Sequence, residues 1–301
     1  MRPLAIAALS LCGVLGGCAM APAGSQTTIR ADVNLVQLHA AVTDSHGHTV
    51  SGLGKDAFAL FVDDVSQPIA VFQGEDAPVT AGIVMDNSAS MAPKRKEAIA
   101  AALAFARASN PRDQMFVVHF NDRARFGLKE GTLFTGDVAE LEAAIGRFEL
   151  GGTTALYDGI MLARTLFSRA AYVKKVLLII TDGGDNASHT ALPDVLNGLT
   201  QDGAVVFAIG IFDPGNRDAN PRALTQLAQV TGGEAFFPSD IADIKKLCEQ
   251  IAAEVRHQYT LGFHGAEDGK YHRIRLVVKD PKYGKLTVHT RAGYFAGKPS
   301  N

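Results

Sequence analysis

Cysteine is scarce in this chain, and its three cysteines predict no disulfide bond. Cys12 lies in an N-terminal apolar segment that we expect to be removed, and Cys18 follows that segment directly. The third belongs to an apolar stripe with helical spacing: Ile241, Ile244, Cys248, Ile251 and Val255. A thiol on the buried face of a helix is inert. Stability must therefore come from the hydrophobic core, which a chain of 301 residues with 47% hydrophobic content can build.

Basic runs are also missing. The formal net charge is −2, and basic residues do not alternate with aromatic ones anywhere in the sequence. A nucleic acid is therefore excluded as the expected partner.

The longest apolar run lies near the N-terminus and is too short to span a membrane as a helix. Arg2 precedes it, and residues 4–15 are almost unbroken in their apolar character. We interpret residues 1–17 as an export signal. The following Leu15-Gly16-Gly17-Cys18 resembles a bacterial lipobox, which implies acylation of Cys18 and anchoring in the cell envelope. Ala19 in place of Asp resembles lipoproteins of the outer membrane or its periplasmic face. Ordinary signal cleavage, with Cys18 unmodified, is the alternative.

The periodicity of the remaining chain changes twice. Residues 18–28 are small and polar and predict a tether. Residues 29–77 alternate as strands do, residues 78–257 alternate strand with helix, and residues 258–301 return to strand periodicity. The middle part predicts an α/β fold with a doubly wound, mainly parallel sheet. Each flank is too small for an independent module, so we predict that the two pair into one small β-sandwich.

Within these parts the pattern places each element. The flanks predict strands at 33–42 (with a bulge at Leu35-Val36), 56–62, 68–72, 259–263, 273–278 and 286–290. The central part predicts strands at 79–85, 115–120, 176–180, 204–211 and 234–237, and helices at 94–109, 137–148, 156–167, 192–199, 221–230 and 240–257. His119 falls inside a strand, where a packed role is expected.

Polar side chains follow two of the buried strands. Asp86, Ser88 and Ser90 form an Asp-x-Ser-x-Ser loop after the first strand, and Asp182 follows the strand at 176–180. Ligands bind at the carboxyl ends of parallel strands, where loops converge. A carboxylate with neutral hydroxyls supplies the hard oxygen ligands that Mg²⁺ prefers. Taken alone, the first loop could simply cap a helix.

A third segment, Gly151-Gly152-Thr153-Thr154, offers a hydroxyl at the start of a helix. Together the three segments resemble the metal-ion-dependent adhesion site (MIDAS) of von Willebrand factor type A domains. The resemblance implies that Asp86, Ser88 and Ser90 bind the metal directly or through water, that a threonine joins them, and that Asp182 acts mostly through water. Thr154 has the apolar Ile160 six positions on, as in the family, whereas Thr153 directly follows the glycine pair; the choice stays open. Mg²⁺ is the expected ion, with Mn²⁺ or Ca²⁺ as alternatives.

Segments outside the central part extend the resemblance over nearly the whole mature chain. They are Asp44-Ser45-His46-Gly47, residues 53–58, Tyr259-Thr260-Leu261-Gly262-Phe263 and Arg291-Ala292-Gly293-Tyr294-Phe295. The chain resembles a bacterial family of exported VWA-related proteins, for which no enzymatic activity is established. Asp158 and Asp185 also lie near the predicted site; Asp158 is expected to cap or brace a loop and Asp185 only to be solvated, and their order as ligands stays open.

The resemblance implies a divalent-cation-dependent protein-binding module, whose partner offers an Asp or Glu carboxylate to the metal. A metal-dependent hydrolase or phosphotransferase is one alternative, and an envelope scaffold with a vestigial metal site is another. The chain lacks a Gly-x-x-x-x-Gly-Lys-Ser/Thr loop, a Gly-x-Ser-x-Gly elbow and a credible catalytic Cys/His pair. Strand-end Asp phosphatases carry a second Asp where this chain has Ser88. We therefore predict that the protein is not an enzyme.

Overall fold

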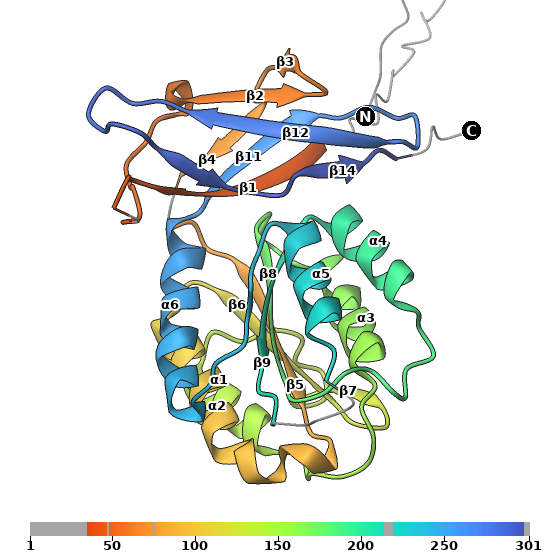
Figure 1. Ribbon diagram of the computed structural model, residues 1–301. Coiled ribbons are helices and arrows are strands. Elements are labelled where there is room, and N and C mark those ends of the chain that lie inside the picture. Colours follow the sequence, from red (N-terminus) through yellow and green to blue (C-terminus); the bar gives the residue numbers. More distant parts are fainter. Residues whose placement is uncertain (1–34, 47, 75, 214–218, 298–301) are drawn as a thin grey trace, which may run out of the picture. The chain divides into compact units, whose positions relative to one another are not determined.

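The computed structural model describes residues 35–46, 48–74, 76–213 and 219–297. The predicted signal, Cys18 and the tether lie outside these residues. No helix in the described part is long and apolar enough to cross a membrane. The described chain forms an α/β domain and a β-sandwich, each with its own hydrophobic core (Figure 1).

The α/β domain is built on one six-stranded sheet with the order β10-β9-β8-β5-β6-β7. All neighbouring strands are parallel except the edge pair β6 and β7. The strands are β5 (Thr80–Asp86), β6 (Gln114–Phe120), β7 (Ala124–Phe126), β8 (Lys175–Thr181), β9 (Ala204–Gly210) and β10 (Ala235–Phe236). This arrangement confirms the predicted doubly wound, mainly parallel fold.

Helices cover both faces of this sheet (Figure 1). One face carries α1 (Arg95–Ala108), α2 (Val138–Gly146) and α6 (Ile244–His257), and the other carries α3 (Leu156–Phe167), α4 (Leu192–Asp202) and α5 (Pro221–Thr231). Two 3₁₀ turns, η2 (Ala89–Lys94) and η3 (Ile241–Asp243), precede α1 and α6. Because both faces are covered, every residue of β5 and β9 is buried, which explains their continuous apolar sequences.

The sandwich combines strands from both ends of the described chain. One sheet has the order β13-β1-β11-β4 and the other β14-β12-β2-β3. The strands are β1 (Leu35–Thr43), β2 (Phe58–Val62), β3 (Val65–Gln67), β4 (Val71–Gln73), β11 (Tyr259–His264), β12 (Tyr271–Val278), β13 (Thr287–His289) and β14 (Gly293–Phe295), with a 3₁₀ turn η1 (Lys55–Ala57) before β2. The predicted pairing of the two flanks is confirmed.

Several details differ from the sequence-based expectation. No bulge interrupts β1 at Leu35-Val36, since its pairing with β11 runs in unbroken register and Leu35 simply faces outward. The strand expected at 68–72 is replaced by β3 and β4 on either side of Pro68. The short strands β7 and β14 were not predicted, because three residues carry too little periodicity.

Candidate metal centre

The carboxylate of Asp86 is buried at the end of the central strand β5, with 2% of the residue exposed. Its Oδ1 accepts a hydrogen bond from the Ser88 backbone N–H at 2.8 Å, and its Oδ2 accepts one from the Thr181 hydroxyl at 2.5 Å. Burial raises the pKa of Asp86, and the nearby charge of Asp182 adds to the rise. A cation at this place would offset the cost of burying the carboxylate.

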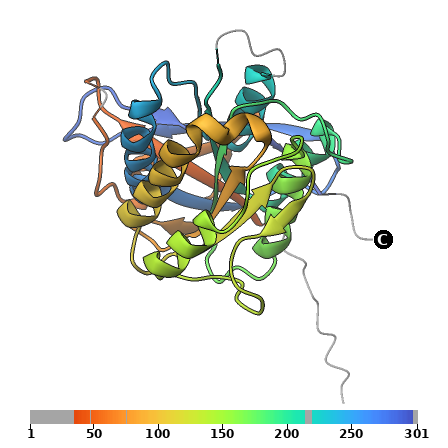
Figure 2. The same ribbon diagram turned by 90° about the horizontal axis from the view of Figure 1, so that it is seen from below.

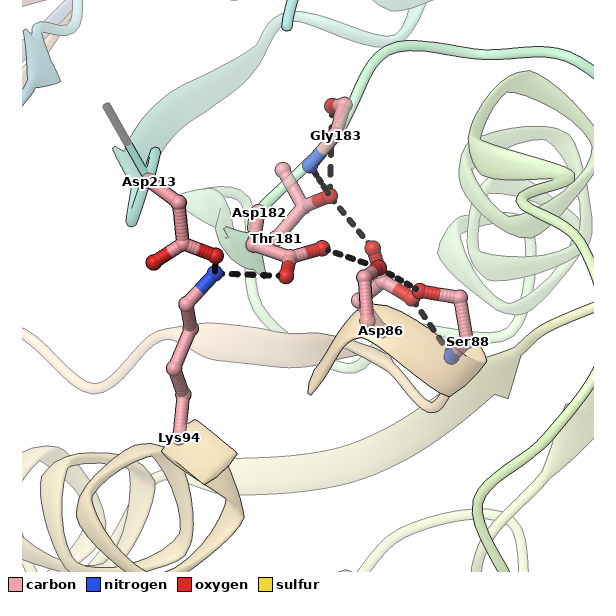
Figure 3. A network of polar contacts seen from close by, with 8 residues as sticks. Asp86, Ser88, Lys94, Thr181, Asp182, Gly183 and Asp213 are labelled. Atoms are coloured by element: carbon pink, nitrogen blue, oxygen red, sulfur yellow. Dashed lines mark hydrogen bonds and ion pairs between the residues drawn. The ribbon is translucent and has the colours of Figure 1, made fainter. Parts of the chain in front are cut away.

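Side chains from the β5 and β8 loops meet beside this carboxylate (Figure 3). The Ser88 and Ser90 hydroxyl oxygens are 3.1 Å apart, and the Ser90 hydroxyl donates to Asp182 Oδ1 at 2.8 Å. Asp182 is fully buried, whereas Ser90 is exposed. The structure thus brings Asp86, Ser88, Ser90 and Asp182 into one hydrogen-bonded group that reaches the surface at Ser90.

The two threonines after the glycine pair have different surroundings. Thr153 is exposed, and its backbone N–H and hydroxyl both donate to Asp122 Oδ1, at 2.7 and 2.5 Å. Gly152, at φ +78°, leaves room for the Asp122 carboxylate where a side chain would otherwise lie. Thr154 is buried, and its Oγ1 lies 3.9 Å from the place that a Cβ on Gly183 would take. The geometry therefore places Thr154 toward the β8 loop and engages Thr153 elsewhere.

Lys94 is the member of this group that sequence reasoning missed. Its ammonium donates to Asp182 Oδ2 at 2.7 Å and to Asp213 Oδ2 at 2.5 Å (Figure 3). Its side chain is only 6% exposed. Burial would lower the pKa of Lys94, but the hydrogen bonds to Asp182 and Asp213 outweigh it and raise the pKa above its usual value. Lys94 precedes the buried Ala98 by four residues, a spacing that already indicates an inward direction.

Two further carboxylates fasten the loop after β8 to α3. Asp158 accepts hydrogen bonds from the backbone N–H groups of His189 and Thr190, each at 3.0 Å. Asp185 accepts one from the Tyr157 N–H in the first turn of α3, at 2.9 Å. The expectation that Asp158 braces a loop is confirmed. The expectation that Asp185 is only solvated is wrong, because this carboxylate satisfies a backbone donor at the helix start.

His119 fixes the side chain that follows Asp86. Its Nε2 lies 2.9 Å from the Ala144 carbonyl oxygen, and its Nδ1 lies 2.7 Å from Asn87 Nδ2. Burial, with the charges of Arg95 and Arg147, lowers the pKa of His119 to about 4. The neutral ring therefore donates from Nε2 and accepts at Nδ1. His119 is a packed residue of the sheet, as expected.

The donor set fits a hard divalent cation. Carboxylate and hydroxyl oxygens converge at one strand edge, and a hydroxyl-rich shell leaves much of the positive charge of the ion available to a further oxygen ligand. Among the described residues no group of three or more His, Cys, Asp or Glu side chains could hold a metal. A site here must therefore use the hydroxyls. Figure 2 views the α/β domain along its strands, with the orange η2 and α1 segment at the near end.

Residues 82–250 match the sequence model of the von Willebrand factor type A domain, which is more than half of the chain. The chain therefore belongs to the von Willebrand factor type A (VWA) family. Domains of this family typically serve as adhesion or protein-interaction modules. No curated protein matches the sequence.

Solved structures share the fold at low sequence identity. The von Willebrand factor type A protein from Catenulispora acidiphila is 16% identical, with a TM-score of 0.55 over 89% of this chain and 75% of that one. Proximal thread matrix protein 1 from the mussel byssus is 22% identical, with a TM-score of 0.51 over 69% of this chain and 51% of that one. A further structure of the mussel protein, with a zinc-occupied MIDAS motif, is 23% identical, with a TM-score of 0.50 over 63% and 48%. This chain thus spans about half of the mussel protein.

Proposed function

We propose that the protein is a divalent-cation-dependent protein-binding module. Asp86, Ser88, Ser90 and Thr154 hold the ion, and Asp182 orients a water bound to it. When bound, the ion supplies an open coordination position for an Asp or Glu carboxylate of a protein partner. The observation that supports this proposal is that Asp86, Ser88, Ser90 and Asp182 meet at the C-terminal ends of β5 and β8. Mg²⁺ is the proposed ion, with Mn²⁺ or Ca²⁺ as alternatives.

The charge balance supports an outside carboxylate as the last ligand. The Lys94 ammonium is shared between Asp182 and the more exposed Asp213, whereas Asp86 accepts hydrogen bonds only from neutral donors among the described residues. An ion held chiefly by Asp86 and hydroxyls keeps a net positive charge, which attracts an anionic oxygen. Ser90 is exposed, and the site is therefore open to a partner on that side.

We also propose that Cys18 carries a lipid that anchors the protein in the cell envelope, at the outer membrane or its periplasmic face. The support is the lipobox-like sequence before Cys18. Several acyl chains on one residue would hold the protein stably, as a single chain does not.

Catalysis by this site has less support. A hydrolase needs a base that can move a proton, and both ring nitrogens of His119 are already hydrogen-bonded within the fold. The Lys94 ammonium is held between two carboxylates and keeps its proton. We therefore favour binding over metal-dependent hydrolysis or phosphoryl transfer.

A cross-linked pull-down from cell envelopes tests the proposed function. The wild-type protein is expected to retain a partner in Mg²⁺ and to lose it in EDTA, and Asp86→Ala is expected to lose it in both. Glu130→Ala, which removes an exposed carboxylate from another loop, is the matched control and should behave as wild type. Retention of the same partner in EDTA would contradict the proposal.

A further inference from the structure

A cavity of about 460 Å³ opens at the same edge of the sheet as the candidate metal centre. Three arginines, Arg123, Arg125 and Arg147, line it, together with Asn87 and His119. Asn87 is also the residue that follows Asp86, so the lining of the cavity and the candidate metal centre are adjacent in the chain. Nothing in the proposed function uses this cavity.

The three arginines come from the turn between β6 and β7, from β7 and from the end of α2. Arg123 lies in the turn between β6 and β7, and Arg125 lies in β7 directly opposite His119 of β6. Residues opposite each other in an antiparallel pair project to the same face of the sheet. Arg147 follows the last residue of α2, and its Nη1 donates to the Leu128 carbonyl oxygen at 3.4 Å.

The guanidinium groups of Arg123 and Arg125 form no hydrogen bond or ion pair with other residues that the structure describes. Two acids lie nearby. Asp122 is engaged by Thr153, whose hydrogen bonds lower the pKa of this carboxyl, with smaller contributions from the charges of Arg123 and Arg125. Glu149 lines the cavity. Three arginines against these two acids leave a locally positive cavity on a chain whose formal net charge is −2.

Asn87 and His119, which line the cavity, carry no charge. His119 stays uncharged because burial lowers its pKa to about 4. Arg95 donates from Nη1 to Asn87 Oδ1 at 3.1 Å and from Nη2 to the Phe148 carbonyl oxygen, so its charge is already engaged. The groups available to an anion are therefore chiefly the exposed guanidinium groups of Arg123 and Arg125.

We propose that this cavity binds a second carboxylate of the same protein ligand, so that the partner is an acidic segment with two carboxylates. The inference rests on the proposed function for the first carboxylate, which binds the metal. A guanidinium group matches a carboxylate through paired N–H donors. Phe148 and Leu150 line the same cavity and offer apolar contact to the methylenes of a glutamate.

Synthetic peptides on one glycine-serine scaffold test the proposal. One peptide carries a single glutamate, and the peptides of a series carry two glutamates at increasing separation. Their affinities are measured in Mg²⁺ and in EDTA for the wild type, Asp86→Ala and the double variant Arg123→Ala/Arg125→Ala. Arg169→Ala removes an exposed arginine elsewhere and is the matched control. Arg123 and Arg125 are exposed, so their removal leaves the core intact.

At the best separation the wild type should bind the two-glutamate peptide about tenfold more tightly than the single-glutamate peptide in Mg²⁺. The double variant should lose this ratio yet keep its affinity for the single-glutamate peptide, and Arg169→Ala should keep both. Equal affinity for the two kinds of peptide in the wild type would overturn the proposal, and so would an unchanged ratio in the double variant. A failure of the metal proposal would appear in a different comparison. In that case the single-glutamate peptide would still bind the wild type in EDTA and would still bind Asp86→Ala.

Discussion

Lys94 carries a charge into the interior beside the candidate metal centre. Its partner Asp182 is fully buried, so removal of the ammonium takes away a positive charge that offsets the burial of this carboxylate, although the Ser90 hydroxyl still donates to it. In EDTA, Lys94→Met should lower the free energy of unfolding by about 3–5 kcal/mol. Saturating Mg²⁺ should recover part of this loss, because the ion binds the folded state. Urea unfolding in EDTA and in Mg²⁺ measures both effects.

Lys96 provides the matched control for this substitution because it lies two residues after Lys94, in the first turn of α1, and is exposed. Lys96→Met should change the free energy of unfolding by no more than about 0.5 kcal/mol. Equal stability of Lys94→Met and Lys96→Met in EDTA would show that the buried ion pair does not hold Asp182 in place.

His119 predicts a dependence of stability on pH. The pKa of its ring falls from 6.5 to about 4 on folding, so the unfolded chain binds more protons between these values. The contribution of the neutral His119 ring to the free energy of unfolding is fully present above pH 6.5. It is lost as the pH falls toward 4, by up to roughly 3 kcal/mol. His119→Gln should reduce this slope in urea unfolding measured across the range. If His119→Gln keeps the wild-type slope of unfolding free energy against pH, the slope does not come from His119.

At the scale of elements, the central strand β5 depends on a glycine. A Cβ on Gly82 would lie 2.6 Å from Phe116 Cε2 and 2.7 Å from Leu177 Cδ2, on the two neighbouring strands. Gly82→Ala should therefore overpack the sheet and lower the free energy of unfolding by about 1–3 kcal/mol. Gly146→Ala, where nothing lies within 4 Å of the added Cβ, is the control for thermal unfolding. If Gly82→Ala and Gly146→Ala have the same melting temperature, β5 is less tightly packed around Gly82 than described.

The sequence predicted best those elements in which several consecutive residues are buried. The all-apolar runs of β5, β8 and β9 identify a sheet covered on both faces, and Asp86 and Asp182 mark where two of these strands end. The three-residue strands β7 and β14 escaped prediction because three residues carry too little periodicity, whether the partner strand is the adjacent one, as for β7, or lies more distant in the sequence, as for β14.

The candidate site shows the same division. Asp86, Ser88 and Ser90 follow one another in a short loop, so a local pattern revealed them. The choice between Thr153 and Thr154 depends on Asp122, which lies 31 residues before Thr153. The role of Lys94 depends on Asp213, which is 119 residues away. A lysine is also usually exposed, and its inward spacing was therefore easy to overlook.

At the scale of the whole molecule, the proposed lipid anchor determines where the binding site acts. Cells that produce the wild-type protein and are labelled with a palmitate analogue should yield labelled protein in the membrane fraction. Cys18→Ala should remove the label and release the protein from that fraction, while Cys248→Ala, which changes a fully buried thiol in α6, should leave the label in place. Labelled Cys18→Ala protein would contradict the lipobox interpretation.

The most direct test of the account is titration calorimetry of the purified protein with Mg²⁺. The wild type should bind a single ion per chain with measurable heat, and Asp86→Ala should show none while its circular dichroism spectrum stays that of a folded protein. Absence of binding heat in the wild type, or equal binding by Asp86→Ala, would contradict the claim that the loops after β5 and β8 form a metal centre.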